Sequence, residues 1–325
     1  MATIKDVSQE AGLSIGTVSR ILNNRGYISE EARKKVDLAM KKLNYQPNEV
    51  ARSLSKKSSS LIGLVVPQLE NPYFSVFISY VEQYAARRGY SILLFCSNGM
   101  EQKESEMLDV CRRNRVAGII LCSGRFSVAT FGELDCPLVT MEREVENELA
   151  SVGCDNYTGG VLAAQHLIDR GCHHVAYLSG LPASYMSRDK RAQGFSDVCR
   201  KNNTEHVEIP FSEELYRNTE YFDFLEEIFT IYSDIDGVFA SNDIIAAQII
   251  QRCAKHGINV PDDMKIVGFD DIPLARWTTP ALTTIHQPLD RMAEATIQIL
   301  LDAKTGAEIK KVVSLPVELV IRGTT

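Results

Sequence analysis

The acidic pair Asp270-Asp271 is the feature of the sequence best suited to contact a ligand. It follows the apolar segment 265–269, and in α/β sheets ligands bind at the loops where strands end. As catalytic carboxylates, the two residues lack a partner base or nucleophile. As hydrogen-bond acceptors for the hydroxyl groups of a ligand, they need neither. The pair therefore favours a binding site for a small polar molecule.

Other sequence signals of catalysis are missing. The sequence has no G-x-G-x-x-G after its first apolar segment, no phosphate-binding loop and no H-E-x-x-H. The pair His173-His174 opens an expected strand, where packing or surface exposure is more common than metal binding. Eight cysteines are scattered without a C-x-x-C pair, which is typical of buried thiols. We therefore predict that the protein is not an enzyme and holds no metal or cofactor.

Length and composition bound the class of protein. A chain of 325 residues, with 45% hydrophobic and 24% charged residues, is long enough for two or three globular units with ordinary cores. No apolar run reaches the roughly 18 residues that span a bilayer, and the first residues have no hydrophobic signal core. We expect a cytoplasmic protein, because nothing here directs it to an oxidising compartment.

Charge is distributed unevenly along the chain. The formal net charge is -7, but residues 1–60 hold eleven Lys or Arg against six Asp or Glu, a net +5. The remaining residues hold 24 against 36, a net -12. A basic segment on an acidic body suits local binding to a polyanion such as nucleic acid. Because many solvated helices carry a similar surplus, this signal needs support from the helix pattern.

Three short helices are predicted in the basic segment. Thr3 and Ser14 are suitable N-caps for the first two, and Gly12 can adopt the left-handed conformation that ends the first. Ser29 can cap a third helix, whose apolar stripe would cover the others. Two short helices joined by a tight glycine turn form a helix-turn-helix. Composition alone leaves open a three-helix bundle that binds another protein.

From residue 61 onward, short apolar segments alternate with amphipathic ones. Such alternation of strands and helices is typical of parallel, doubly wound sheets. The predicted strands span residues 62–66, 90–96, 117–122, 137–141, 174–179, 237–240 and 265–269. The predicted helices span residues 73–88, 101–114, 158–170, 189–202, 218–231, 242–256 and 288–303.

Long motifs of the chain resemble the lactose repressor/galactose repressor (LacI/GalR) family of transcription regulators. They lie in residues 2–7, 11–14, 17–20, 23, 45–54 and 277–285, and the resemblance extends from about residue 2 to residue 322. It implies an all-α helix-turn-helix headpiece (1–46), a hinge helix and linker (47–60), and an α/β periplasmic-binding-protein-like sensor (61–325). The sensor is expected to dimerise and to consist of two doubly wound lobes. Three crossovers near 156–160, 286–290 and 315–319 would connect the lobes.

The resemblance also implies roles on DNA. A recognition helix in the major groove would read bases through Ile15, Gly16 and Arg20. Arg20 can donate two hydrogen bonds to guanine and Ile15 can contact a thymine methyl group, whereas Gly16 offers no side chain. Phosphate contacts, which position the helix without specifying sequence, are implied for four residues: Thr3, Thr17, Ser19 and Asn23.

The predicted hinge is short enough to act as a switch. Pro47 stops the preceding helix, and Asn48 is a suitable N-cap for residues 49–56. A helix of this length is marginal alone in water, so it would fold only against a second copy and DNA. In the family, the leucine at the position of Leu54 is a wedge in the minor groove that bends the DNA. The alternative is a disordered linker in which Leu54 has no role.

Five residues of the body correspond to effector-binding positions of the family: Tyr73, Phe74, Arg191, Asn242 and Asp270. Apolar stacking combined with arginine and carboxylate hydrogen bonds is a way to hold a sugar-like molecule. A sugar or sugar phosphate is therefore the expected effector. Other interpretations stay open, since Asn242 could cap a helix, Arg191 could form an ion pair between lobes, and the two aromatic residues could belong to the core.

These signals together predict a repressor that is controlled by a metabolite between the two lobes. One recognition helix covers too few base pairs to select an operator, so a homodimer would read a pseudo-palindrome. One alternative is a global catabolite regulator that uses a phosphocarrier protein as co-regulator. A solute-binding receptor is a further alternative, but it would have no use for the headpiece.

Overall fold

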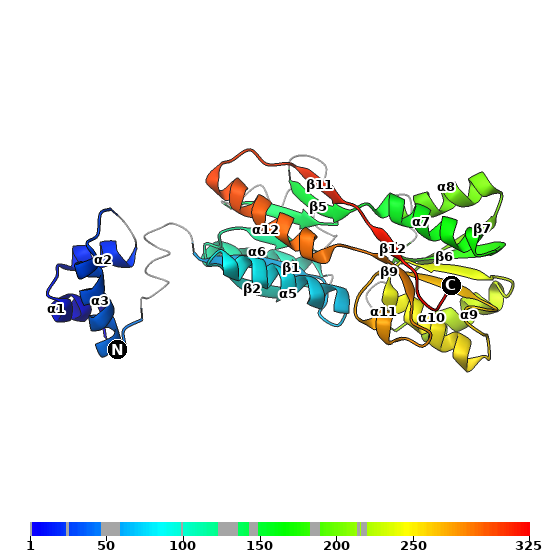
Figure 1. Ribbon diagram of the computed structural model, residues 1–325, viewed down its shortest axis with the longest axis horizontal. Helices are drawn as coiled ribbons and strands as arrows, with labels where there is room; N and C mark the ends of the chain where they lie inside the picture. Colours follow the sequence, from blue (N-terminus) through cyan, green and yellow to red (C-terminus); the bar gives the residue numbers. More distant parts are fainter. Residues whose placement is uncertain are drawn as a thin grey trace.

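The first segment of the chain folds into three helices. The structure is a computed structural model that describes residues 2–23, 26–46, 59–98, 100–122, 136–142, 149–182, 189–212, 215 and 220–325. The three helices are α1 (Ile4–Ala11), α2 (Ile15–Leu22) and α3 (Glu30–Lys42), which begin where the sequence predicts (Figure 1). Most of the predicted hinge, residues 47–58 with Leu54, lies outside the described residues.

Local hydrogen bonds fix the ends of these helices. The hydroxyl of Thr3 accepts a hydrogen bond from the backbone N–H of Asp6, whose carboxylate accepts one from Thr3 N, so the two form a capping box. Gly12 has φ of 66°, the left-handed conformation predicted for it. Ser14 caps α2 through Thr17 N. The helices share a small apolar core, formed chiefly by Val7, Ala11, Val18, Ile21, Val36 and Ala39.

The body is built from one parallel and one mostly parallel sheet, each with helices on its faces. The first sheet has the strand order β11-β5-β4-β3-β1-β2 and defines the N-lobe. Its elements are β1 (Leu61–Val66), α5 (Pro72–Arg87), β2 (Ser91–Cys96), α6 (Glu101–Arg113), β3 (Ile119–Leu121), β4 (Leu138–Met141), β5 (Ala150–Cys154), α12 (Leu289–Thr305) and β11 (Val312–Leu315). Strand β1 is almost wholly buried, as expected for a strand covered on both faces.

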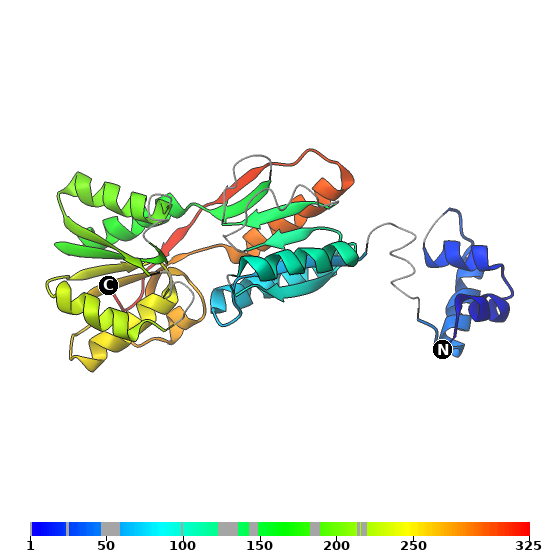
Figure 2. The same cartoon turned by 180° about the vertical axis from the view of Figure 1, so that it is seen from behind.

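The second sheet, with the order β12-β10-β9-β8-β6-β7, defines the C-lobe. Its strands run parallel except β12, which pairs antiparallel with β10. Its elements are α7 (Asn156–Asp169), β6 (His174–Pro182), α8 (Lys190–Asn202), β7 (Glu205–Phe211), α9 (Phe222–Ile231), β8 (Gly237–Ala240), α10 (Asp243–Lys255), β9 (Lys265–Asp270), α11 (Leu274–Trp277), β10 (Thr283–His286) and β12 (Glu318–Val320). Figure 2 shows both lobes from behind.

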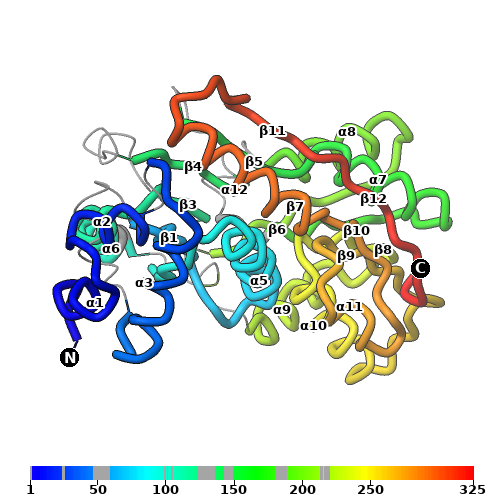
Figure 3. Tube along the Cα trace, turned by 60° about the vertical axis from the view of Figure 1, so that its left-hand side comes forward, coloured from blue at the N-terminus to red at the C-terminus, as the bar shows by residue number. Residues whose placement is uncertain are grey.

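Three segments carry the chain from one lobe to the other, as predicted. They lie between β5 and α7, between β10 and α12, and between β11 and β12. The crossing strands are paired with one another: Cys154 is in register with Leu315, and His286 with Glu318. The connections therefore lie side by side, and Figure 3 shows β11 and β12 passing from lobe to lobe.

Every strand and helix predicted for the body occurs, with ends displaced by at most four residues. Six elements were not predicted: β5, β7, α11, β10, β11 and β12. Most of them are only three to five residues long, and β7 carries polar residues at the open edge of its sheet. Among the helices in the described part of the chain, none combines the length and the apolar character that crossing a bilayer requires.

Candidate functional site

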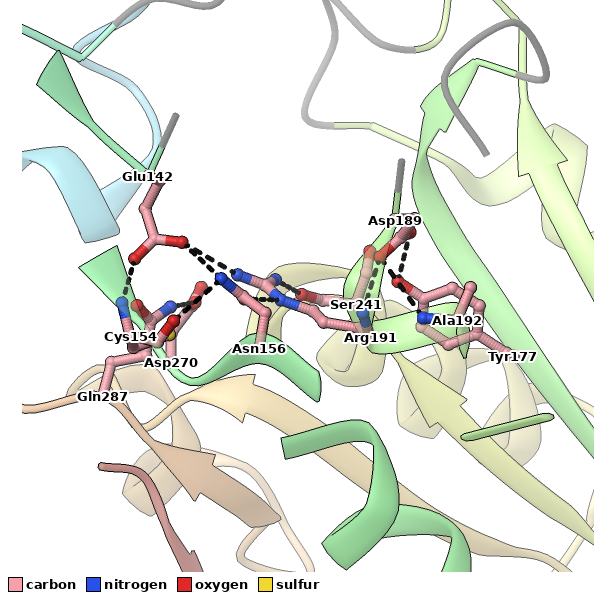
Figure 4. Close-up of polar contacts among 10 residues, drawn as sticks. All are labelled: Glu142, Cys154, Asn156, Tyr177, Asp189, Arg191, Ala192, Ser241, Asp270 and Gln287. Carbon is pink, nitrogen blue, oxygen red and sulfur yellow. Dashed lines mark hydrogen bonds and ion pairs between the residues drawn. The ribbon is translucent and has the colours of Figure 1, made fainter. Parts of the chain in front are cut away.

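Arg191 lies at the centre of a polar cluster between the two lobes (Figure 4). Its Nε donates to Asn156 Oδ1 at 2.6 Å, and its Nη1 donates to the carbonyl oxygen of Ser241 at 2.6 Å. Its guanidinium also stacks on the ring of Phe269, with Cζ 3.6 Å from the ring centroid. These contacts fix the arginine in one position, and we call the group around it the central cluster: Glu142, Cys154, Asn156, Arg191, Asp270 and Gln287.

Glu142 joins the N-lobe to this arginine. The residue follows β4 with φ of 57°, a backbone conformation that is uncommon for residues other than glycine. Its carboxylate accepts hydrogen bonds from Cys154 N and from Asn156 Nδ2, each at 2.8 Å. Arg191 Nη2 lies 4.0 Å from its Oε2. A carboxylate of one lobe is thus held against the cation of the other.

Asp270 brings a second carboxylate to the cluster from the end of β9. Its φ is 116°, which is strained for aspartate, and its Oδ1 accepts a hydrogen bond from Gln287 Nε2 at 2.6 Å. Burial raises the pKa of Asp270 to about 7, although Arg191 and the hydrogen bond from Gln287 act in the opposite direction. The carboxyl group therefore changes charge near neutral pH unless a ligand alters its surroundings.

Two polar atoms in or beside the central cluster are buried without a hydrogen-bond partner among the described residues: Tyr73 Oη and Gln287 Oε1. Burial is the main reason that the pKa of Tyr73 is raised well above its ordinary value, and the charges of Glu142 and Asp270 add to the effect. The tyrosine is therefore a neutral hydroxyl that can donate a hydrogen bond. Because unpaired buried polar groups are costly, both atoms point to a ligand that would satisfy them.

The backbone that carries Arg191 is held from two sides. Asp189 caps α8 by accepting from Arg191 N and Ala192 N, and its other oxygen accepts from Tyr177 Oη and Ser179 Oγ. Helices α7 and α8 approach so closely that a Cβ at Gly160 would lie 2.1 Å from the carbonyl oxygen of Arg191. This contact leaves α8 little freedom to shift, so the guanidinium is preorganised.

The outward face of α2 is the second candidate site. Ile15 is 47% exposed, an unusual environment for isoleucine, and Gly16 and Arg20 are also exposed. Val18 and Ile21 point instead into the small core. Arg20 has no hydrogen-bond or ion-pair partner among the residues that the structure describes. The helix thus presents an apolar group and an unused guanidinium to solvent, which suits contact with base edges.

Comparison with known proteins identifies the chain. A family model described as bacterial regulatory proteins, lacI family, matches residues 3–48, and one described as periplasmic binding protein-like domain matches residues 164–325. The ribose operon repressor of Bacillus subtilis (strain 168) is 37% identical over 326 residues, which cover 100% of this chain and 99% of that repressor. The chain belongs to the lacI family.

Two solved structures support this membership over different spans. The lac repressor dimer bound to operator and the anti-inducer ONPF has a TM-score of 0.86 and 25% identity, covering 99% of this chain and 98% of that one. The periplasmic binding protein/LacI transcriptional regulator of Alkaliphilus metalliredigens QYMF, complexed with D-xylulofuranose, has a TM-score of 0.74 and 31% identity, covering 82% and 99%. Like the rest of the lacI family, this chain is a transcription regulator and not an enzyme.

The structure brings Tyr73, Arg191 and Asp270 together, as the lacI family resemblance implies. Phe74 is half-buried and packs edge-on against Tyr73, with ring centroids 5.2 Å apart. Asn242 caps α10, since its Oδ1 accepts from Ile245 N, so the capping interpretation holds for this oxygen. Arg191 forms the interlobe contact with Glu142 that was the alternative to ligand binding, and the two roles are compatible.

The four residues expected to contact phosphate differ in how far their side chains are already hydrogen-bonded within this lacI family headpiece. The hydroxyls of Thr3 and Thr17 take part in local caps, with Asp6 and Ser14. Asn23 Nδ2 donates to the carbonyl oxygen of Ser19 at 2.8 Å. The phosphate roles therefore stay predictions, and so does the wedge role of Leu54, which lies outside the described residues.

Glu142, Asn156 and Gln287 were not predicted as site residues. Glu142 directly follows the predicted strand 137–141, so the same strand-end argument that selected Asp270 applies to it. Asn156 and Gln287 lie where the chain crosses between lobes. For these two, the sequence gives a place at the boundary of the lobes but no sign of the contacts they make.

Proposed function

We propose that this chain is a cytoplasmic, homodimeric repressor whose headpieces bind operator DNA and whose central cluster binds a sugar. The observation that carries the proposal is the Arg191-centred cluster, in which both lobes contribute carboxylates and two buried polar atoms lack partners among the described residues. Carboxylates accept hydrogen bonds from sugar hydroxyl groups, arginine donates to sugar oxygens, and aromatic side chains cover the apolar face of a sugar.

The charges of the central cluster favour a neutral sugar over a sugar phosphate. Within the cluster Arg191 is the cation, and it already contacts Asn156, Ser241 and Glu142. Two carboxylates, Glu142 and Asp270, would repel a phosphate group that lay beside them. A pentose of the ribose class fits this environment, and ribose operon repressors are among the relatives of the chain.

The proposed signal passes from the cluster to the hinge through a change in the angle between the lobes. A sugar that contacts Glu142 of the N-lobe and Asp270 of the C-lobe binds the closed arrangement better than the open one. Such a difference in affinity is what allows a ligand to shift an equilibrium. In a dimer, a new lobe angle would alter the spacing of the two hinges (47–60), whose predicted helices would need one another and DNA to fold.

On DNA, we propose that Ile15 and Arg20 contact base edges, with Gly16 allowing close approach, and that Thr3, Thr17, Ser19 and Asn23 contact phosphates. Leu54 would act as the minor-groove wedge of residues 47–60, between the headpiece (1–46) and the sensor (61–325). A phosphocarrier co-regulator stays a prediction, for which the described residues offer no specific support.

The effector proposal is tested by thermal unfolding of the full chain with D-ribose, D-xylulose, sucrose and ribose 5-phosphate. A pentose present at a hundred times its dissociation constant should stabilise the sensor by about 2.7 kcal/mol. Stabilisation by ribose 5-phosphate but by no neutral sugar would overturn the choice of ligand class. No response to any of them would remove sugars from the proposal.

The DNA proposal is tested separately, by titrating binding to a duplex that the protein selects from a random pool. The dissociation constant should rise steeply with salt, because cations of the headpiece release counterions from the phosphates. Arg20→Ala should weaken binding about 5- to 150-fold and relax the preference at one base pair. Binding that is flat in salt, or no selected sequence, would contradict a sequence-specific regulator.

A further inference from the structure

One edge of the N-lobe sheet carries exposed cations, although residues 61–325 as a whole have a net charge of -12. We call it the basic edge and define it by five exposed residues: Arg87, Arg113, Arg115, Lys310 and Lys311. The three segments that contain them, 84–91, 109–118 and 302–312, hold eight Lys or Arg against three Asp or Glu, a net +5. The charge of these three segments is therefore opposite to that of residues 61–325 as a whole.

The topology explains why these residues gather. Each lies just before a strand of the parallel N-lobe sheet, and parallel strands all begin at one edge of their sheet. Arg87 precedes β2, Arg113 and Arg115 precede β3, and Lys310 and Lys311 precede β11. Backbone hydrogen bonds tie these turns to their neighbours, as in the 2.7 Å bond from Ser151 N to the carbonyl oxygen of Lys311.

Four of the five cations have no ion-pair partner among the residues that the structure describes. Arg113, Arg115, Lys310 and Lys311 form no ion pair with any residue in the described ranges. By contrast, the neighbouring Arg112 is paired with Asp109 at 3.0 Å. Unpaired exposed cations repel one another at short range, so keeping several at one edge suits an external polyanion.

The basic edge is also where the chain enters the N-lobe from the headpiece. Ser59 donates from its backbone N to the carbonyl oxygen of Arg115 at 2.8 Å and from its Oγ at 3.0 Å. The start of β1 and the end of α12, which leads to Lys310 and Lys311, lie at the same end of the lobe (Figure 1). Only residues 47–58 separate this edge from the last described residue of the headpiece.

We propose that the basic edge binds the phosphate backbone of the same DNA that the headpieces hold. This inference rests on the proposed function. Strand β11 lies four strand positions from β1, which is about 19 Å at roughly 4.8 Å per strand. The edge can therefore reach several phosphates along about half a turn of DNA. DNA suits the edge better than an acidic protein, because the linker already tethers this edge to a DNA-binding unit.

The edge would add DNA contacts that do not depend on base sequence, and these contacts belong to the sensor rather than to the headpiece. Contacts between cations and phosphates position a protein on DNA without reading bases. Because these cations sit on the N-lobe, their distance from the DNA depends on how the lobe is oriented above the hinge. Release of the phosphates would therefore accompany any effector-driven rotation of the N-lobe.

The test uses the full-length triple variant Arg113→Gln/Arg115→Asn/Lys311→Gln. Asparagine is chosen at position 115 because it tolerates the positive φ of 48° there. The matched control, Arg170→Gln/Lys201→Gln/Arg276→Gln, removes the same charge from exposed positions of the C-lobe. The dissociation constants for a wild-type-selected duplex and for a random duplex are measured from 50 to 200 mM salt.

The triple variant should bind both duplexes at least tenfold more weakly at 50 mM salt. The slope of log K against log salt should become shallower by about 0.9 for each phosphate that the variant no longer neutralises. The control should match the wild type, and D-ribose binding and the melting temperature should be equal in all three proteins. If the triple variant does not fold, Lys311→Gln alone should still reduce the slope.

Two failures are distinguishable. If the wild type binds with a steep salt dependence and the triple variant behaves like the control, the basic edge does not contact DNA, and an acidic protein becomes the partner to test. If the wild type shows no DNA binding, the proposed function and this inference fall together.

Discussion

In each lobe, a residue at the end of a strand brings a carboxylate to the central cluster, and both residues have a positive φ. Glu142 follows β4 with φ of 57°, and Asp270 ends β9 with φ of 116°. Their surroundings differ. The Glu142 carboxylate accepts two hydrogen bonds at 2.8 Å and faces Arg191 as well. Asp270 accepts one from a side chain, that of Gln287, and is almost fully buried.

This difference indicates a division of labour. Glu142 is engaged by its own lobe and by the crossing segment at Asn156, so its main contribution is to orient Arg191 across the boundary between the lobes. Asp270 can accept further hydrogen bonds, and burial raises its pKa to about 7. Its carboxyl group therefore depends more on a ligand for hydrogen-bond partners. In the proposed function, Asp270 of the C-lobe would accept hydrogen bonds from the sugar, and Glu142 of the N-lobe would make the contact that responds to closure.

Arg191→Ala should have the largest effect on sugar affinity, because it removes the guanidinium group that the carboxylates of Glu142 and Asp270 face. Taking one partner from a buried ion pair costs about 3 kcal/mol, so we expect sugar affinity to fall at least 100-fold. Operator binding should persist and no longer respond to sugar, as measured by calorimetry and by DNA release. Arg200→Ala, on the exposed face of the same helix, is the control. A normal response in the Arg191 variant would exclude the arginine from the site.

Asp270→Asn should have the next largest effect, a loss of sugar affinity of about 10- to 150-fold, since hydrogen bonds to a charged group are worth about 1.5–3 kcal/mol. In the wild type, sugar affinity should increase as pH rises through about 7, where the carboxyl group becomes ionised. The variant should show no such rise between pH 6 and 8. A rise that persists in the variant would assign the titration to another group.

The same substitution has a consequence for stability whose sign follows from the pKa. The pKa of Asp270 is raised from 3.8 to about 7 on folding, so between these values the folded state binds the proton and the unfolded state does not. This group's contribution to stability is therefore present at low pH and declines as pH rises from about 4 to 7. Urea unfolding of Asp270→Asn should lack this decline.

Glu142→Gln should have the smallest effect, because the amide keeps an oxygen that can accept from Cys154 N. We expect sugar affinity to change less than tenfold, with a larger change in the fraction of closed protein in the absence of sugar, measured by small-angle scattering. Glu142→Asp keeps the negative charge and is the control for the loss of that charge in Glu142→Gln. A loss greater than that of Asp270→Asn would reverse the assignment of roles to the two strand ends.

The sequence predicts best what is decided locally. Thr3, Ser14 and Gly12 cap or end helices through bonds within a few residues, and their conformations are those expected. Asp270 was predicted because strand ends form sites in α/β sheets, and Glu142 was overlooked although the same argument covers it. The partners of Asn156 and Gln287 depend on how the lobes meet, which no local pattern specifies. Strands such as β12 owe their existence to pairing with a distant strand.

The three segments that cross between the lobes determine how many kinds of motion the sensor has. A single connection would let one lobe bend, twist and slide against the other. Here β5 pairs with β11 on one side of the crossing, and β10 pairs with β12 on the other. Side-by-side connections of this kind resist twisting and sliding far more than bending. The two lobes therefore move relative to one another mainly by bending. Any ligand held between them acts through one variable, the angle between the lobes.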